Sequence, residues 1–217
     1  MLNVPVISII FIDNGSIIMA GILVQLLISW GLLWFIEKEN LSVLGLMPTT
    51  RRVTELLLFL LVSMACCSSG FLFRIFYGHE VWKLNPSFSP GLLFNGSWWN
   101  LKSVMFEELI FRGAIFYILI KRVGAAYSIL ISSVAFGIYH WFSFEVIGNI
   151  GQMIQVFLIT GIIGVLYAYG FVRTNSLYAM IGMHFGWNFT QGFIFSSGSI
   201  GDGILVLQKP VPVVTVS

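Results

Sequence analysis

The chain has 217 residues, of which 58% are hydrophobic and only 9% are charged, and its formal net charge is +2. A soluble domain carries about 25% charged residues, so this few charges cannot cover a water-exposed surface around so apolar a chain. The small net charge, and the lack of a basic cluster interleaved with aromatic residues, exclude nucleic acid as an expected partner. The composition therefore predicts an integral membrane protein that has the lipid bilayer as its solvent.

Apolar stretches that could cross a bilayer recur along the chain. A transmembrane helix needs about 20 mainly apolar residues. The candidate stretches are Ser16–Ile36, Val53–Ile75, Trp98–Ile120, Gly124–Phe142, Ile147–Val172 and Ser176–Ser197. The first, second and fifth are the most apolar, whereas the other three carry polar residues. The sequence thus predicts an all-α, polytopic transmembrane helical bundle with about six membrane helices, in which residues 76–97 form the longest connection.

Basic residues gather on alternate connections of this predicted bundle. The connections after the first, third and fifth helices contain Lys38, Arg51, Arg52, Lys121, Arg122 and Arg173. Short loops rich in lysine and arginine face the cytoplasm. We therefore expect a multi-pass protein with these three connections on the cytoplasmic side, and its small size and short loops favour a bacterial cell membrane.

Two adjacent carboxylates and an arginine lie inside the third predicted helix. Glu108 and Arg112 are four residues apart, so they share a helix face, with the acid on the favourable N-terminal side. Glu107 points about 100° away from Glu108, so Arg112 cannot easily serve both. Ionisable residues within a membrane are costly and are functional by default. Glu107 is therefore the predicted general base, while a structural role remains open for the Glu108–Arg112 pair.

Two further helices each carry a histidine. Phe136 lies one turn before His140, and His184 lies one turn before Asn188. Taken singly, His140 could belong to an interfacial aromatic belt, and His184 with Asn188 could form an interhelical hydrogen-bond pair. Unpaired polar groups are not tolerated in lipid, so the simplest arrangement places all of them in one interior cavity. That cavity would be suited to activating water and stabilising an oxyanion.

Three ordered motifs carry a family resemblance. Residues 107–112 read EELIFR, residues 136–140 read FGIYH and residues 184–188 read HFGWN, which fit EExxxR, FxxxH and HxxxN. The ordered set resembles the signature of the CPBP family, which includes CAAX prenyl proteases of the Rce1 type and the bacterial Abi proteins. The resemblance covers about Trp98 to Asn188. It divides the chain into N-terminal membrane helices with a connecting loop (1–97), a CPBP-like catalytic membrane core (98–200) and a loosely ordered tail (201–217).

The resemblance implies an intramembrane endopeptidase. Glu107 and His140 would activate the attacking water, His184 and Asn188 would bind the oxyanion, and the supporting residues would be Glu108, Arg112 and Phe136. The substrate would be a membrane-embedded or lipidated peptide or protein, in CAAX-type processing or in bacteriocin or pheromone processing or self-immunity. We favour a mechanism without a cofactor, and a divalent metal such as zinc held by Glu107, His140 and His184 is the alternative.

Two other function classes remain open from the residues alone. A transporter or proton-relay channel could use the same buried ionisable groups, although a relay needs a continuous polar path. A non-catalytic immunity protein could use the same fold. The complete motif set favours the peptidase, because a non-catalytic relative is free to lose a motif residue.

Overall fold

The computed structural model describes residues 6–196 and 203–208, and it describes side chains from residue 16 onward. Within this part, the chain forms seven α-helices: α1 (Val6–Leu32), α2 (Thr50–Gly78), α3 (Pro90–Arg112), α4 (Ala114–Val123), α5 (Ala125–Ser143), α6 (Ile150–Thr174) and α7 (Tyr178–Phe189). π-Helical turns extend α1 (Leu33–Glu37) and α7 (Thr190–Ile194), and a 3-10 turn spans Leu41–Leu44. The predicted all-α helical bundle is confirmed.

Four helical segments among the described residues are long and apolar enough to cross a membrane. They are Ser16–Glu37, Thr50–Gly78, Ala125–Ser143 and Ile150–Thr174. About six were expected from the sequence. The difference lies in α3, which buries several charged side chains, and in α4 and α7, which have only 10 and 12 residues. Helices inside the bundle need no continuous apolar surface, because their neighbours shield them from lipid.

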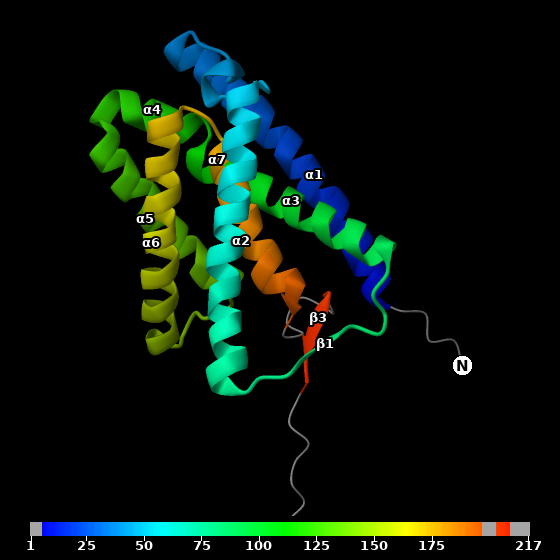
Figure 1. Cartoon of the computed structure of the whole chain (residues 1–217). Coiled ribbons are helices and arrows are strands. Elements are labelled where there is room, and N and C mark those ends of the chain that lie inside the picture. Colours follow the sequence, from blue (N-terminus) through cyan, green and yellow to red (C-terminus); the bar gives the residue numbers. More distant parts are fainter. Residues whose placement is uncertain (1–5, 197–202, 209–217) are drawn as a thin grey trace, which may run out of the picture.

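The helices pack mainly in pairs (Figure 1). α2 lies along α7, α5 along α6, and α1 along α3. In Figure 1, α2 and α6 stand nearly upright, while α1 and α3 cross the view obliquely. The C-terminal half of α3 also contacts α5, α6 and α7. This position brings the charged residues of α3 to the centre of the bundle.

The predicted third helix, Trp98–Ile120, is wrong as a single element. The chain instead forms α3 and α4, which are separated at Gly113. A Cβ atom at residue 113 would collide with the carbonyl oxygen of Leu109, so only glycine fits this junction. The break comes directly after Arg112, and it therefore redirects the chain immediately beyond the charged residues.

Side-chain caps explain where the helices begin. Thr49 accepts a hydrogen bond from the amide of Arg52 at the start of α2. Ser89 accepts one from the amide of Leu92, with Pro90 in the first turn of α3. Serine and threonine favour this position, and proline fits the first turn because the amide it lacks would be unpaired there. The long connection expected over 76–97 is therefore shorter, and it spans residues 79–89.

The predicted cytoplasmic connections meet at one end of the bundle. Glu37, at the end of the π turn after α1, forms ion pairs of 2.7 Å with both Lys121 and Arg122 at the end of α4. The hydrogen bond from Lys121 to Glu37 raises the pKa of the lysine. The amide of Leu177, between α6 and α7, donates to the carbonyl of Leu44 at 3.3 Å. These contacts place the basic residues on one side, as the positive-inside pattern predicts.

A small sheet lies at the opposite end of α2, in the order β1–β3–β2. β1 (Trp82–Leu84) pairs antiparallel with β3 (Leu205–Leu207), and β2 (Phe195–Ser196) pairs parallel with β3. The sheet holds part of the predicted tail against the connection between α2 and α3. The tail residues 201–202 and 209–217 lie outside the described residues.

Glycines of α7 allow its close approach to α2. A Cβ atom at Gly182 would collide with the carbonyl oxygen of Leu56, and one at Gly186 would meet the carbonyl oxygen of Leu60. The hydroxyl of Ser63 on α2 also donates to the carbonyl of Met183 at 2.6 Å. Small residues let membrane helices pack backbone against backbone. The depth and rotation of α7 are thereby fixed by α2.

We expect Gly182→Ala to destabilise the protein by about 1–3 kcal/mol, the usual cost of overpacking a close contact. The obstacle is backbone, so no side-chain rotation can relieve it. The measurement is the thermal unfolding midpoint of the purified protein in detergent. Gly70→Ala on α2 is the matched control, because a Cβ there meets nothing within 4 Å. A Gly182→Ala midpoint equal to the control would contradict the packing argument.

Candidate active site

The buried charges of α3 form an ion pair inside the bundle. Glu108 and Arg112 are both fully buried, with 3.3 Å between Oε1 of the glutamate and Nη1 of the arginine. Nη2 of Arg112 lies 3.4 Å from the carbonyl oxygen of Gly164 on α6, to which it donates. The predicted pairing of these two residues is therefore present. A charge pair this deep is tolerated only when further hydrogen bonds support it.

His184 supplies one of these further contacts. Its Nδ1 lies 2.8 Å from Oε1 of Glu108, and its Nε2 lies 3.8 Å from Oε2 of Glu107. The imidazole thus lies between the two adjacent carboxylates. The sequence predicted the pairing of Glu108 with Arg112, but it did not predict that Glu108 also holds the ring of His184 on α7.

The hydrogen bond to Glu108 fixes the proton on His184. An ionised carboxylate only accepts hydrogen bonds. Nδ1 of His184 therefore carries the proton when Glu108 is ionised in its pair with Arg112. Nε2 is then the nitrogen that faces Glu107. The carboxylate of Glu107 and Nε2 of His184 therefore face each other, and they form the candidate reactive side of the cluster.

His140 is oriented by its own helix. It lies in the last turn of α5, and its Nδ1 is 2.8 Å from the carbonyl oxygen of Phe136. A carbonyl cannot donate, so Nδ1 carries the proton and Nε2 is left to accept one. α5 ends at Ser143, which places His140 near a helix end, as the sequence indicates. Its side chain is nevertheless buried.

The ring of Phe136 lies between the charged groups. The Cζ atom of Arg112 lies 4.4 Å from its centroid. The rings of His140 and His184 lie 4.4 and 6.1 Å from it, both edge to face. A guanidinium over an aromatic face is electrostatically favourable, and more so where water is excluded. Phe136 therefore connects α3, α5 and α7 around one point, which fits its predicted supporting place.

Three buried polar atoms of this cluster have no hydrogen-bond partner among the described residues. They are Oε2 of Glu107, Oε2 of Glu108 and Nε of Arg112. Buried polar atoms are otherwise almost always satisfied, and the exceptions mark sites that bind water, ions or substrate groups. The cluster therefore retains hydrogen-bonding capacity next to the proposed base. Asn188, one turn beyond His184 on α7, is half-buried.

The same residues do not converge as a metal site. In the part of the chain that the structure describes, no group of three or more histidine, cysteine, aspartate or glutamate side chains is arranged to hold a metal ion. Within the cluster itself, the carboxylate of Glu108 is shared by a guanidinium and an imidazole. A mechanism without a metal stays a prediction.

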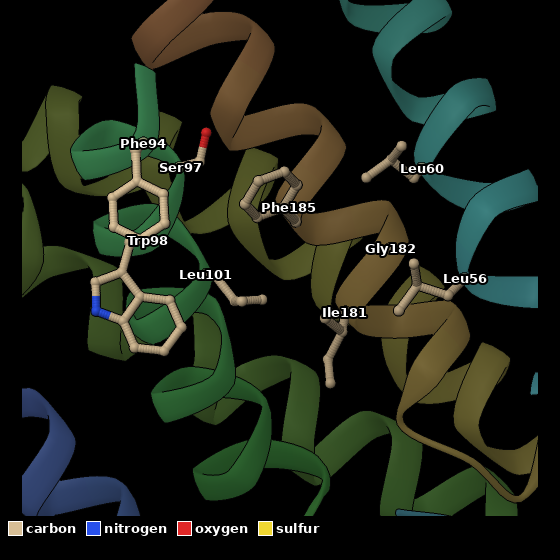
Figure 2. Close-up of a pocket in the computed structure, with 9 residues that line it drawn as sticks. All are labelled: Leu56, Leu60, Phe94, Ser97, Trp98, Leu101, Ile181, Gly182 and Phe185. Atoms are coloured by element: carbon tan, nitrogen blue, oxygen red, sulfur yellow. The ribbon is translucent and has the colours of Figure 1, made fainter. Parts of the chain in front are cut away.

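The structure also has an apolar pocket of about 370 Å³ (Figure 2). It is bordered by α2, α3 and α7, and its lining residues are Leu56, Leu60, Phe94, Ser97, Trp98, Leu101, Ile181, Gly182 and Phe185. The only hydroxyl in this lining belongs to Ser97, which donates to the carbonyl of Leu93. Phe185 directly follows His184, and Leu101 lies two turns before Glu108 on α3. The pocket and the cluster therefore share α3 and α7.

Sequence reasoning missed the contribution of α6. Gly164 accepts a hydrogen bond from Arg112, and the ring of Tyr167 lies against both Arg112 and His184. The predicted span Ile147–Val172 contains no charged residue, so nothing in it drew attention as chemistry. The available signal for these contacts was the spacing of Gly164 and Tyr167, which are three residues apart and share a helix face. That spacing alone does not indicate a functional site.

Residues 89–190 match the family model described as Type II CAAX prenyl endopeptidase Rce1-like. The matched segment contains α3 to α7 and every residue of the cluster described above. No curated protein and no solved structure gives a significant match to the chain.

We expect Arg112→Leu to destabilise the protein by about 3–5 kcal/mol, because it leaves Glu108 buried without its cation. The double variant with Glu108→Leu should recover part of this loss, since apolar replacement of a whole buried pair is often neutral. Unfolding midpoints in detergent measure both effects.

Arg51→Leu is the control for this pair of variants. Arg51 pairs with Glu55 at 2.8 Å on the exposed start of α2, so its loss should cost less than about 1 kcal/mol. An Arg112→Leu variant as stable as Arg51→Leu would show that the buried pair does not hold the bundle together.

Proposed function

We propose that the chain is an intramembrane endopeptidase, because residues 89–190 match the family model of Rce1-like type II CAAX prenyl endopeptidases. It hydrolyses a peptide bond of a membrane-associated peptide or protein with Glu107, His140, His184 and Asn188. The observation that carries the proposal is the buried cluster in which His184 lies between Glu107 and Glu108, with His140 across Phe136. The family match favours this activity over transport.

The proposed reaction begins with water beside Glu107. The carboxylate of Glu107 takes one proton of the water, and Nε2 of His140 accepts a hydrogen bond from the other O–H, as the water oxygen attacks the carbonyl carbon of the substrate. The proton on Nδ1 of His140 is held by Phe136, so Nε2 is available as the acceptor. When the C–N bond breaks, Glu107 returns the proton to the leaving amine. General acid–base catalysis of this kind contributes about 10²–10⁴-fold.

The proposed oxyanion site uses His184 and Asn188. Nδ1 of His184 is occupied by Glu108, so the ring can donate to an oxyanion only through a protonated Nε2. The amide of Asn188, one turn away, provides a second donor.

The apolar pocket supports a substrate that carries a hydrocarbon chain. All of its side chains except those of Ser97 and Trp98 are hydrocarbon, and it is bordered by α3 and α7, which also carry the cluster. Such a pocket favours a lipidated peptide, as in CAAX-type processing, over an unmodified polar one. Processing of a bacteriocin or pheromone precursor, with self-immunity as its outcome, is the other substrate class we propose.

We expect Glu107→Gln and His140→Ala each to reduce cleavage of a farnesylated CAAX peptide by at least about 10²-fold, because each removes a group that activates the attacking water. The assay uses a peptide with a fluorophore and a quencher on either side of the scissile bond, and purified protein in detergent. Glu80→Gln, which alters a partly exposed partner of Arg74, is the control and should keep full activity. Metal analysis of the same purified sample tests the metal-free mechanism.

Full activity of purified Glu107→Gln would contradict the proposal. So would unchanged bacteriocin protection by cells that carry this variant, which would favour a non-catalytic immunity protein. Glu107→Gln is also suited to trapping the natural substrate, because it preserves the shape of the site.

We expect Leu101→Trp to fill the pocket and to raise KM for the farnesylated peptide by about tenfold, the effect of unburying roughly two methylene groups. KM for the same peptide without the lipid should change little. Leu58→Trp on the lipid-facing side of α2 is the matched control, because Leu58 is exposed and lies outside the pocket. An equal rise in KM for both peptides would contradict the assignment of the pocket to the lipid chain.

A further inference from the structure

One tyrosine of α6 contacts two members of the charged cluster. Tyr167 is buried, with 2% of its surface exposed. The centroid of its ring lies 5.0 Å from that of His184, and the two ring planes differ by 31°. The Cζ atom of Arg112 lies 5.2 Å from the same centroid. The ring therefore lies against the imidazole and the guanidinium at once.

These contacts restrict the rotation of the His184 imidazole that its hydrogen bond still permits. The hydrogen bond from Nδ1 of His184 to Glu108 fixes one atom of the imidazole, but the ring can still turn about that contact. The outer torsion of a histidine side chain is broad, so hydrogen bonding alone does not set its plane. Tyr167 covers one side of the ring, and Phe136 approaches at an interplanar angle of 81°. Rotation of the imidazole is thus limited from two directions.

The ring face of Tyr167 is also electrostatically matched to its neighbours. Aromatic faces carry negative potential, and cations above them are attracted, more strongly where water is excluded. Arg112 is such a cation, and His184 becomes one when both of its nitrogens are protonated. Glu107, Glu108 and Arg112 on α3 and His140 on α5 are the other ionisable groups around this point.

We propose that Tyr167 is a positioning residue, which holds the plane of His184 so that Nε2 faces Glu107 and the reacting carbonyl. The proposal rests on the peptidase function proposed above. The contacts described all involve the ring, so the ring and not the hydroxyl carries the role. Tyr167 acts through His184 and does not touch the substrate.

The test compares Tyr167→Phe, Tyr167→Leu and Tyr167→Met with two controls on α6. Tyr169→Leu removes an exposed ring two residues away. Phe171→Leu removes a fully buried ring that packs against Phe116, with 5.6 Å between their centroids, and that lies outside the cluster. Phe171→Leu therefore reports what loss of a buried α6 ring does to stability alone. Tyr167→Met has a longer, unbranched and more flexible side chain that adapts to irregular gaps, and it serves if Tyr167→Leu does not fold.

The expected kinetic result separates positioning from packing. Tyr167→Leu and Tyr167→Met should lower kcat for the farnesylated CAAX peptide by about 10- to 100-fold, the usual effect of a misplaced group, with KM nearly unchanged. Tyr167→Phe should restore kcat to within about threefold of the wild type. Phe171→Leu should lower the unfolding midpoint and leave kcat within about threefold of the wild-type value. Normal kcat in Tyr167→Leu, or equal damage in Tyr167→Phe, would overturn the proposal.

A second measurement does not depend on a substrate. The protein has three histidines, so selective labelling and a His184→Gln variant identify the imidazole protons of His184 by NMR. An adjacent aromatic ring shifts these protons, and the shift should persist in Tyr167→Phe and vanish in Tyr167→Leu. An unchanged spectrum in Tyr167→Leu would overturn the proposal. A wild-type protein that cleaves no peptide would instead overturn the peptidase function, and the NMR result alone would then decide the contact of Tyr167 with His184.

Discussion

The rest of the site depends on one fully buried ion pair, between Glu108 and Arg112 on α3. A pair at this depth is stable only if its remaining hydrogen-bonding groups are satisfied. Each neighbouring helix contributes to that requirement. α6 supplies the carbonyl of Gly164, α5 supplies the ring of Phe136 and α7 supplies His184. The need to compensate one buried charge pair therefore brings α5, α6 and α7 around α3, and the proposed catalytic groups are placed by the same contacts.

Composition and motif spacing predict much of this arrangement. Few charges and long apolar stretches predict the membrane bundle, and the spacing of Glu108 and Arg112 predicts their pairing. The rest depends on tertiary contacts. A single hydropathy window cannot detect that Gly113 divides Trp98–Ile120, because the reason is a clash with a carbonyl four residues earlier. It also cannot tell a helix that faces lipid from one shielded by its neighbours, which is why six spans were expected and four meet the requirement.

The candidate site shows the same limit. His184 was identified from its motif, but its contact with Glu108 joins residues 76 positions apart. Spacing along one helix says nothing about which of two adjacent carboxylates faces another helix. Tyr167 was missed for a related reason, because a tyrosine in an apolar helix gives no signal until its ring is seen against a charged group. Patterns within one helix were thus predictable, and partners between helices were not.

The packing of α7 against α2 has a consequence for biosynthesis. The hydrogen bond between Ser63 and Met183 joins residues 120 positions apart, so α2 is made long before the helix that covers it. α7 is short, and it carries a histidine that a bilayer does not readily accept. During synthesis, Glu108 and Arg112 are therefore present in the membrane before α7 supplies His184. A chain interrupted before α7 lacks His184 and therefore retains an incompletely compensated charge pair in the membrane.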